Sequence, residues 1–286
     1  MATRSNRRAQ RRTRRRPHPW PILSTIQRSA QRRWRETHTF FHAVSKTPPL
    51  TKACLGATLL LILFLTVNWI YHAMTKPSEV FFPLDQSLGK NLTQSWQDYG
   101  PLFREHATAV ITPELLAALA QVESSGNPVA RTYWRWQWGL NPFSWYQPAS
   151  SAVGMFQLTD ATFQEAKRYC IHDHHVAEDG PWQDRQSCWF NSLYTRVIPS
   201  HAIEMTAALL DRRVALEIAK QPQATPKQKH NLAAVIHLCG AGAGHDFAVH
   251  RFRLKPHQRC GDHDVRTYLT RVELLKQQFA KLNTNG

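Results

Sequence analysis

The longest uninterrupted run of apolar positions lies near the N-terminus of the chain. Residues 53–75 contain no Lys, Arg, Asp or Glu, and a helix of this length crosses the ~30 Å hydrocarbon core of a bilayer. Trp69 and Tyr71 lie near its C-terminal end, where amphipathic rings favour the membrane interface. The pattern predicts one transmembrane helix that acts as an uncleaved signal anchor. A buried core helix and a cleaved signal peptide are the alternatives; the second lacks the small residue that cleavage requires.

Beyond residue 76, apolar positions recur at helical spacing and strand patterns are scarce. The clearest helix should begin at Thr112-Pro113, because Thr is a good N-cap and Pro is tolerated at the first helical position. Other helices are expected to start near Thr159 or to cover about 200–219, 227–238 and 264–281. Residues 76–108 hold three prolines (Pro77, Pro83 and Pro101) and little periodicity, which indicates a stalk or linker. We therefore expect a mainly α domain over residues 109–286.

The positive charge of the chain is confined to its first 52 residues. The formal net charge is +16, but residues 1–52 hold 14 Lys or Arg and one acid, Glu36, which leaves the rest only slightly basic. This distribution excludes a uniformly basic nucleic-acid-binding domain. The positive-inside bias makes residues 1–52 a cytoplasmic tail and places everything after the apolar run on the other side. The run Arg4–Arg16 could contact RNA or anionic lipid without sequence preference, but a topology signal without a specific nucleic-acid partner is favoured.

The cysteines agree with export. Cys54 lies in the apolar run, and the other four follow it. An even number fits two disulfides in an oxidising compartment. Of the three pairings, the local one closes short loops and is preferred, namely Cys170–Cys188 and Cys239–Cys260.

Neither the cysteines nor the histidines form a typical metal motif. No C-x-x-C pair occurs, which leaves zinc as a weak alternative. None of the histidines has the H-E-x-x-H spacing of a helical zinc site, and we interpret them as solvated loop residues: His172, His174, His175, His237, His245, His250 and His263. No metal and no cofactor are expected.

Glu123 is the candidate catalytic residue. It ends an apolar helix beside a turn, at a boundary between core and solvent. Partial burial there disfavours the charged carboxylate, as a general acid at neutral pH requires. A solvated Glu at the end of a helix is the plainer alternative.

Four segments, in order, resemble the soluble lytic transglycosylase (SLT) family. The segment Leu116–Pro128 is similar to the family's catalytic segment, in which the Glu of an E-S motif ends the first lysozyme-like helix. Ser151–Thr159 resembles its S-x-A-x-G-L-M-Q segment, Leu238–Gly244 its A-Y-N-A-G-P-G loop, and Asp264–Val272 its E-T-R-N-Y-V-x-R-V helix. From the first segment to the last, the resemblance extends over about 160 residues. The resemblance implies a lysozyme-like helical domain preceded by one transmembrane helix.

The resemblance also implies a reaction with a single carboxyl group. The family cleaves the bond between N-acetylmuramic acid and N-acetylglucosamine in peptidoglycan. Glu123 would protonate the glycosidic oxygen and then act as base on the C6 hydroxyl, which closes a 1,6-anhydro ring. The substrate's acetamido group would stabilise the cation, in contrast to the usual pair of carboxylates. In agreement, no acid lies between Glu123 and Asp160.

Further site residues follow from the same resemblance. Ser124 and Gln157 would line the cleft and bind the sugars. Met155 and Phe156 would form an apolar wall near the scissile bond, or else belong to the core. Tyr268 would orient Glu123 through its hydroxyl, or else be an ordinary helix tyrosine.

The chain departs from the family at two places. Cys239-Gly240 stands where the family has Tyr-Asn, so the phenol near the catalytic Glu is missing, and either another group replaces it or activity is reduced. Residues 129–150 form an insertion in which aromatic and polar residues alternate from Tyr133 to Trp138. These rings could stack on sugars, with Arg135 meeting peptide-stem carboxylates. Packing onto the domain or contact with the membrane surface is favoured.

The expected protein is thus a peptidoglycan lytic transglycosylase of the bacterial inner membrane, with its catalytic domain in the periplasm. Its partners would be peptidoglycan glycan strands and the membrane, with envelope secretion or division machinery as a further candidate. Two alternatives remain open. A hydrolytic muramidase would need a positioned water and a second carboxylate, and a non-catalytic peptidoglycan-binding scaffold would not need Glu123.

Overall fold

A computed structural model describes residues 48–76, 79–80, 87–184, 186–219 and 221–284. The predicted basic tail lies outside the described residues up to position 47. The chain divides into two compact units, Met1–Leu65 and Thr66–Gly286. Each is described by itself.

Helix α2 (Pro49–Thr75) contains the predicted transmembrane segment and is long and apolar enough to cross a membrane. Its leucines are exposed, including Leu59, Leu60 and Leu63. Only 6% of its most apolar window is buried, which argues against a core helix. The last turns of α2 belong to the second unit, where Asn68 and His72 are buried.

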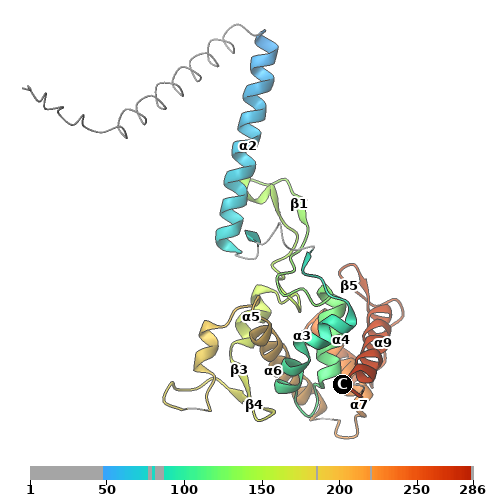
Figure 1. The fold of residues 1–286 in the computed structure, drawn as a ribbon. Coiled ribbons are helices and arrows are strands. Elements are labelled where there is room, and N and C mark those ends of the chain that lie inside the picture. Colours follow the sequence, from blue (N-terminus) through green and yellow to red (C-terminus); the bar gives the residue numbers. More distant parts are fainter. Residues whose placement is uncertain (1–47, 77–78, 81–86, 185, 220, 285–286) are drawn as a thin grey trace, which may run out of the picture. The chain divides into compact units, whose positions relative to one another are not determined.

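The second unit is mainly helical (Figure 1). After α2 come α3 (Leu92–Glu105), α4 (Pro113–Ser124), α5 (Asp160–Ala166), α6 (Pro199–Ile218), α7 (Pro226–Cys239), α8 (Ala241–Val249) and α9 (Val265–Thr284). Helix α4 packs against α3 and α9, and α7 packs against α6, α8 and α9. The core therefore surrounds α4, whose residues Leu115–Ala120 are all buried.

Five predicted helices are present within a few residues of their expected bounds. Helix α4 begins as its sequence indicates, because the Thr112 hydroxyl accepts a hydrogen bond from the Leu115 amide at 3.3 Å. It ends at Ser125, whose left-handed backbone (φ 54°) stops the helix.

Helix α3 corrects the prediction that residues 76–108 are a stalk. Asn91 caps it, and Trp96, Tyr99 and Phe103 point into the core. Pro101 lies inside this helix and does not break it. It is tolerated because Pro101 is exposed, so water can reach the carbonyl four residues earlier that loses its intrahelical partner.

Helix α8 was also not predicted, since its sequence is rich in glycine. Gly244 explains why glycine is needed in it: a Cβ there would lie 2.2 Å from the Ile236 side chain. The absence of a side chain lets α8 approach α7 closely.

Among the described residues, three short antiparallel hairpins accompany the helices. They are β1 (Trp134–Trp136) with β2 (Tyr146–Pro148), β3 (Tyr169–His172) with β4 (His175–Glu178), and β5 (Arg259–Cys260) with β6 (His263–Asp264). Short 3-10 turns cover Pro142–Ser144 and Trp189–Leu193. Both preferred disulfides are present, Cys170–Cys188 and Cys239–Cys260.

Candidate active site

Glu123 lies in the last turn of α4, where the backbone leaves the core. Its side chain is 18% exposed. The chain reverses immediately after it, because the Ser125 and Gly126 amides bond back to the carbonyls of Gln121 and Ala120. The sequence folds this way because an apolar helix meets Ser-Gly-Asn-Pro, which favours a turn. The carboxyl group is therefore rigidly attached but remains accessible.

Tyr268 on α9 holds this carboxyl group. Its hydroxyl donates to Glu123 Oε1 at 2.6 Å, and the residue is buried. Burial, and then the negative charge of Glu123, raise the pKa of Tyr268 well above its usual value. The phenol therefore stays protonated and acts as a donor at every physiological pH.

His237 on α7 approaches the same oxygen. Its Nε2 lies 3.6 Å from Glu123 Oε1, and its side chain is 8% exposed. Burial is the main cause that lowers the pKa of His237; the charge of Arg213 adds to this, and the charge of Glu123 opposes it. At neutral pH the ring is therefore neutral.

The position of His237 corrects its interpretation as a solvated loop histidine. It lies in the last turn of an apolar helix, directly before Leu238-Cys239-Gly240. That position was a usable signal: a helical residue just ahead of the third motif faces the site that the motif forms. His237 is thus a polar group beside Glu123, near the position from which the family's phenol is missing.

Met155, Phe156 and Ser124 do not present free side chains to an open cleft. Met155 and Phe156 are fully buried, so they belong to the core and do not form an open wall. The Ser124 hydroxyl lies 2.9 Å from the Met155 carbonyl and 3.2 Å from that of Ala120, and its proton is used within the protein. Ser124 thereby fixes the segment 151–159 to α4.

Gln157 occupies a left-handed backbone position (φ 48°) in that segment. Its side-chain amide donates to the carbonyls of Gly154 at 2.9 Å and Ala130 at 3.2 Å. The donor nitrogen therefore holds the turn, while the side chain still lines a pocket.

This pocket has a volume of about 240 Å³, and His237 is one of the residues that line it. Its walls come from the segment after Gln157 and from α5, α6 and α7: Gln157, Leu158, Thr159, Thr162, Thr206, Leu209, Leu210, Arg213, Ile236, His237, Leu238 and Gly240. Arg213 forms a two-point ion pair with Glu165. Hydroxyls, an amide and a guanidinium together make a wall suited to a polar, hydroxyl-rich ligand.

Glu123 is the carboxyl group that acts on both of its neighbours. Among the described residues, the charges of Glu123 and Arg213 shift the pKa of His237. Glu123 is the one charged group that shifts the pKa of Tyr268. The described part of the chain holds no group of three or more His, Cys, Asp or Glu suited to a metal.

A mostly buried carboxyl group at the end of a core helix, near a polar pocket in a mainly helical domain, agrees with the expected lysozyme-like class. Residues 101–216 match the model of the transglycosylase SLT domain, so the chain carries a domain of the SLT family, whose members are lytic transglycosylases acting on peptidoglycan. The match includes Glu123 and ends before His237 and Tyr268. Neither a curated protein nor a solved structure matches the chain.

His237 should make stability depend on pH. Its pKa is lowered below 6.5 in the fold, so on acidification the unfolded chain takes up the proton first and stability falls, by at most about 1.4 kcal/mol per pH unit from this group. Melting curves of the full chain in detergent at pH 7.5 and 5.5 measure the loss. It should be smaller in His237→Gln; an equal loss would assign the effect to other groups.

Proposed function

We propose that the chain is a lytic transglycosylase that cleaves the β-1,4 bond between N-acetylmuramic acid and N-acetylglucosamine and leaves a 1,6-anhydro end. One observation carries the proposal: a single carboxyl group, Glu123, is held by a protonated phenol and a neutral imidazole beside a polar pocket.

We assign different tasks to the two carboxyl oxygens. Tyr268 occupies Oε1, and none of the described residues hydrogen-bonds Oε2. Oε2 would therefore carry the proton that moves to the glycosidic oxygen as the C1–O bond breaks. The resulting carboxylate would then take the proton of the C6 hydroxyl while that oxygen bonds to C1. Glu123 ends protonated again, so the cycle is complete without water.

The two neighbours suit both states of Glu123. Tyr268 donates to the carboxylate and stabilises it after the first step. A neutral His237 adds no permanent positive charge, which would hold Glu123 ionised and prevent it from acting as an acid. His237 supports an active enzyme despite Cys239-Gly240, because it supplies a polar group where the family's phenol is missing.

The disulfide Cys239–Cys260 lies between the two positioning elements. Cys239 follows His237 by two residues at the end of α7, and Cys260 lies in β5, ahead of the helix that carries Tyr268. The crosslink therefore restricts the movement of both neighbours of Glu123. We assign it a role in keeping the site assembled.

The polar pocket beside His237 is proposed as the glycan-binding site. Gln157 Oε1 and the Thr162 hydroxyl can accept hydrogen bonds from sugar hydroxyls and acetamido groups. Arg213 keeps its ion pair with Glu165 and contributes positive charge to this wall. Ser124 acts indirectly, by holding the segment that carries Gln157.

The proposed location is the bacterial inner membrane, with the N-terminus in the cytoplasm and the SLT domain in the periplasm. The exposed apolar surface of α2, the two disulfides and the extracytoplasmic substrate of the family support it.

Mass spectrometry of the fragments released from sacculi tests the reaction. Fragments with 1,6-anhydro ends are expected. Reducing ends would indicate a hydrolase, and binding without release would indicate a scaffold.

Tyr268→Phe should lower the maximal rate of muropeptide release by about 10–100-fold, because a hydrogen bond to a charged group contributes about 1.5–3 kcal/mol. Substrate binding should be unchanged, since the phenol faces Glu123. Initial rates over a range of sacculi concentrations separate the two effects. Tyr99→Phe is the matched control, a buried phenol on α3 beside Lys90. A rise in half-saturation with an unchanged maximal rate would contradict the positioning role.

A further inference from the structure

The insertion 129–150 carries an exposed aromatic surface that the proposed reaction does not use. We call residues 133–148 the aromatic hairpin; it contains β1, β2 and the turn between them. Trp136 is 55%, Trp138 81% and Leu140 fully exposed. The rings contact one another and form one apolar surface: Trp136 stacks on Trp138 with centroids 6.5 Å apart, and Trp138 lies tilted against Trp145 at 5.8 Å. A clustered surface of this kind indicates a binding partner.

The aromatic hairpin is bonded to the last turns of α2. The Asn68 side chain donates to the Tyr146 carbonyl at 2.5 Å, and His72 Nε2 lies 2.9 Å from the Phe143 carbonyl. The Tyr71 ring stacks on Phe143 with centroids 4.6 Å apart. The hairpin backbone therefore accepts the side-chain amide of Asn68 and pairs with one ring nitrogen of His72, while Asn68 Oδ1 has no hydrogen-bond partner among the described residues.

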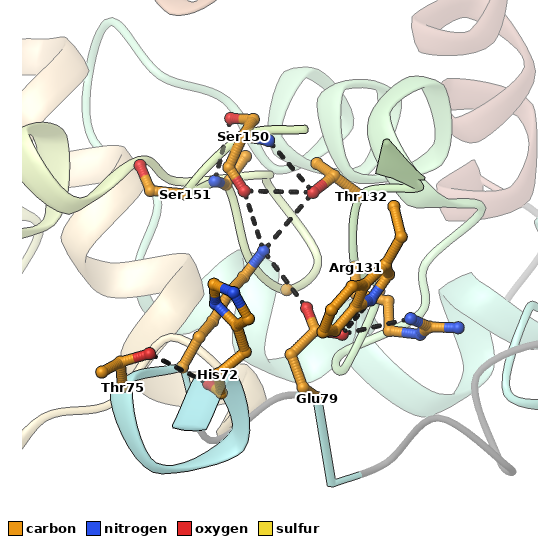
Figure 2. Close-up of polar contacts among 12 residues, drawn as sticks. His72, Thr75, Glu79, Arg131, Thr132, Ser150 and Ser151 are labelled. Atoms are coloured by element: carbon orange, nitrogen blue, oxygen red, sulfur yellow. Dashed lines mark hydrogen bonds and ion pairs between the residues drawn. The ribbon is translucent and has the colours of Figure 1, made fainter. Parts of the chain in front are cut away.

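A buried ion cluster fixes the base of the hairpin (Figure 2). Glu79 is fully buried and contacts Lys76 at 3.5 Å, Arg131 at 3.1 Å and the Trp134 indole nitrogen at 2.8 Å. Lys76 also donates to the Ser150 carbonyl at 3.0 Å. Burial lowers the pKa of Lys76, and Glu79 counteracts this. The first charged residue after the apolar run is thus held by the insertion.

We propose that the aromatic hairpin inserts into the headgroup region of the membrane that α2 crosses. This inference rests on the proposed signal anchor. Asn68 and His72 belong to the uncharged run 53–75, and pairing them with backbone carbonyls is the arrangement that a lipid environment requires. Trp side chains beside the end of a span prefer the interface.

Charge and backbone hydrogen bonding set the depth of insertion. The edges of a two-stranded hairpin leave backbone groups unpaired, so it cannot enter the hydrocarbon core. Residues 124–159 contain no Asp or Glu, and Arg135 is exposed and can reach lipid phosphates. The favoured partner is therefore the lipid headgroup layer. A sugar platform is less favoured, because none of the residues lining the pocket beside His237 belongs to the hairpin.

Fluorescence quenching in proteoliposomes tests the proposal. The full chain with Cys54→Ser is labelled with an environment-sensitive fluorophore at Leu140→Cys and reconstituted in phosphatidylcholine–phosphatidylglycerol vesicles. Leu193→Cys is the matched control, an exposed leucine outside the hairpin. A spin-labelled lipid with its nitroxide near the headgroup should quench the Leu140 label at least about twofold more than the Leu193 label. Iodide in the buffer should quench the Leu193 label more than the Leu140 label.

A third label at Leu60→Cys separates this proposal from the anchor on which it rests. Quenching of Leu60 by a deep nitroxide, without quenching of Leu140, would keep the anchor and overturn the hairpin proposal. No quenching of Leu60 would overturn the anchor and the hairpin proposal with it. Equal quenching of the Leu140 and Leu193 labels by the headgroup nitroxide would also overturn the hairpin proposal. So would a result in which soluble glycan fragments, in the absence of lipid, protect the Leu140 label from iodide.

Discussion

Replacing Glu123 with glutamine should lower the release of muropeptides from purified sacculi by about 10²–10⁴-fold, the usual contribution of a positioned general acid and base. The glutamine amide keeps the size of the side chain and can still accept the Tyr268 hydroxyl. It can neither give a proton to the glycosidic oxygen nor take one from the C6 hydroxyl. Mass spectrometry of released products, with the full chain in detergent, measures the loss.

Glu114→Gln provides the matched control for this variant. Glu114 lies in the first turn of the same helix and bonds Asn283 at the surface, so its replacement should leave release unchanged. Both variants should melt within a few degrees of the original chain. Undiminished formation of 1,6-anhydro ends by Glu123→Gln would contradict the assignment of this residue.

Gly154→Ala should destabilise the SLT domain by about 3 kcal/mol, through backbone strain and a steric clash. Gly154 has φ +81°, and an added Cβ would lie 2.2 Å from the Arg196 backbone carbonyl oxygen and 3.1 Å from that of Pro128. Neither atom can move away as the end of a flexible side chain could. The same turn carries Gln157, so the damage extends to the pocket.

Chemical unfolding followed by circular dichroism measures this loss. Gly242→Ala is the control, because this position lies in α8 with no atom within 4 Å of an added Cβ. There the substitution should be neutral or stabilising by up to about 1 kcal/mol, as alanine favours helix. If Gly154→Ala were as stable as the control, the turn could not be as tight as described.

Local signals predicted much of the fold. Thr112 and Pro113 place the start of α4 because capping and proline geometry are set by neighbouring residues. Glu123 and Tyr268 could be identified because each lies in a motif with defined spacing, although their 2.6 Å contact joins residues 145 positions apart.

Other features depend on packing that no local pattern encodes. Helix α3 forms despite Pro101, because its aromatic face is buried by α4 and α9. Met155 and Phe156 resemble cleft residues in the motif, yet the turn at Gly154 directs both into the core. His237 stands directly before the third motif, but only the approach of α7 to Glu123 brings it into contact with the carboxyl group.

The ion cluster around Glu79 couples two distant parts of the sequence. Lys76, directly after α2, and Arg131 in the insertion share this buried carboxylate at 3.5 and 3.1 Å. Loss of either cation would leave the buried carboxylate under-compensated, at a cost of about 3–5 kcal/mol. The end of α2 and the insertion are therefore expected to become ordered together, so that a substitution at either cation destabilises both segments.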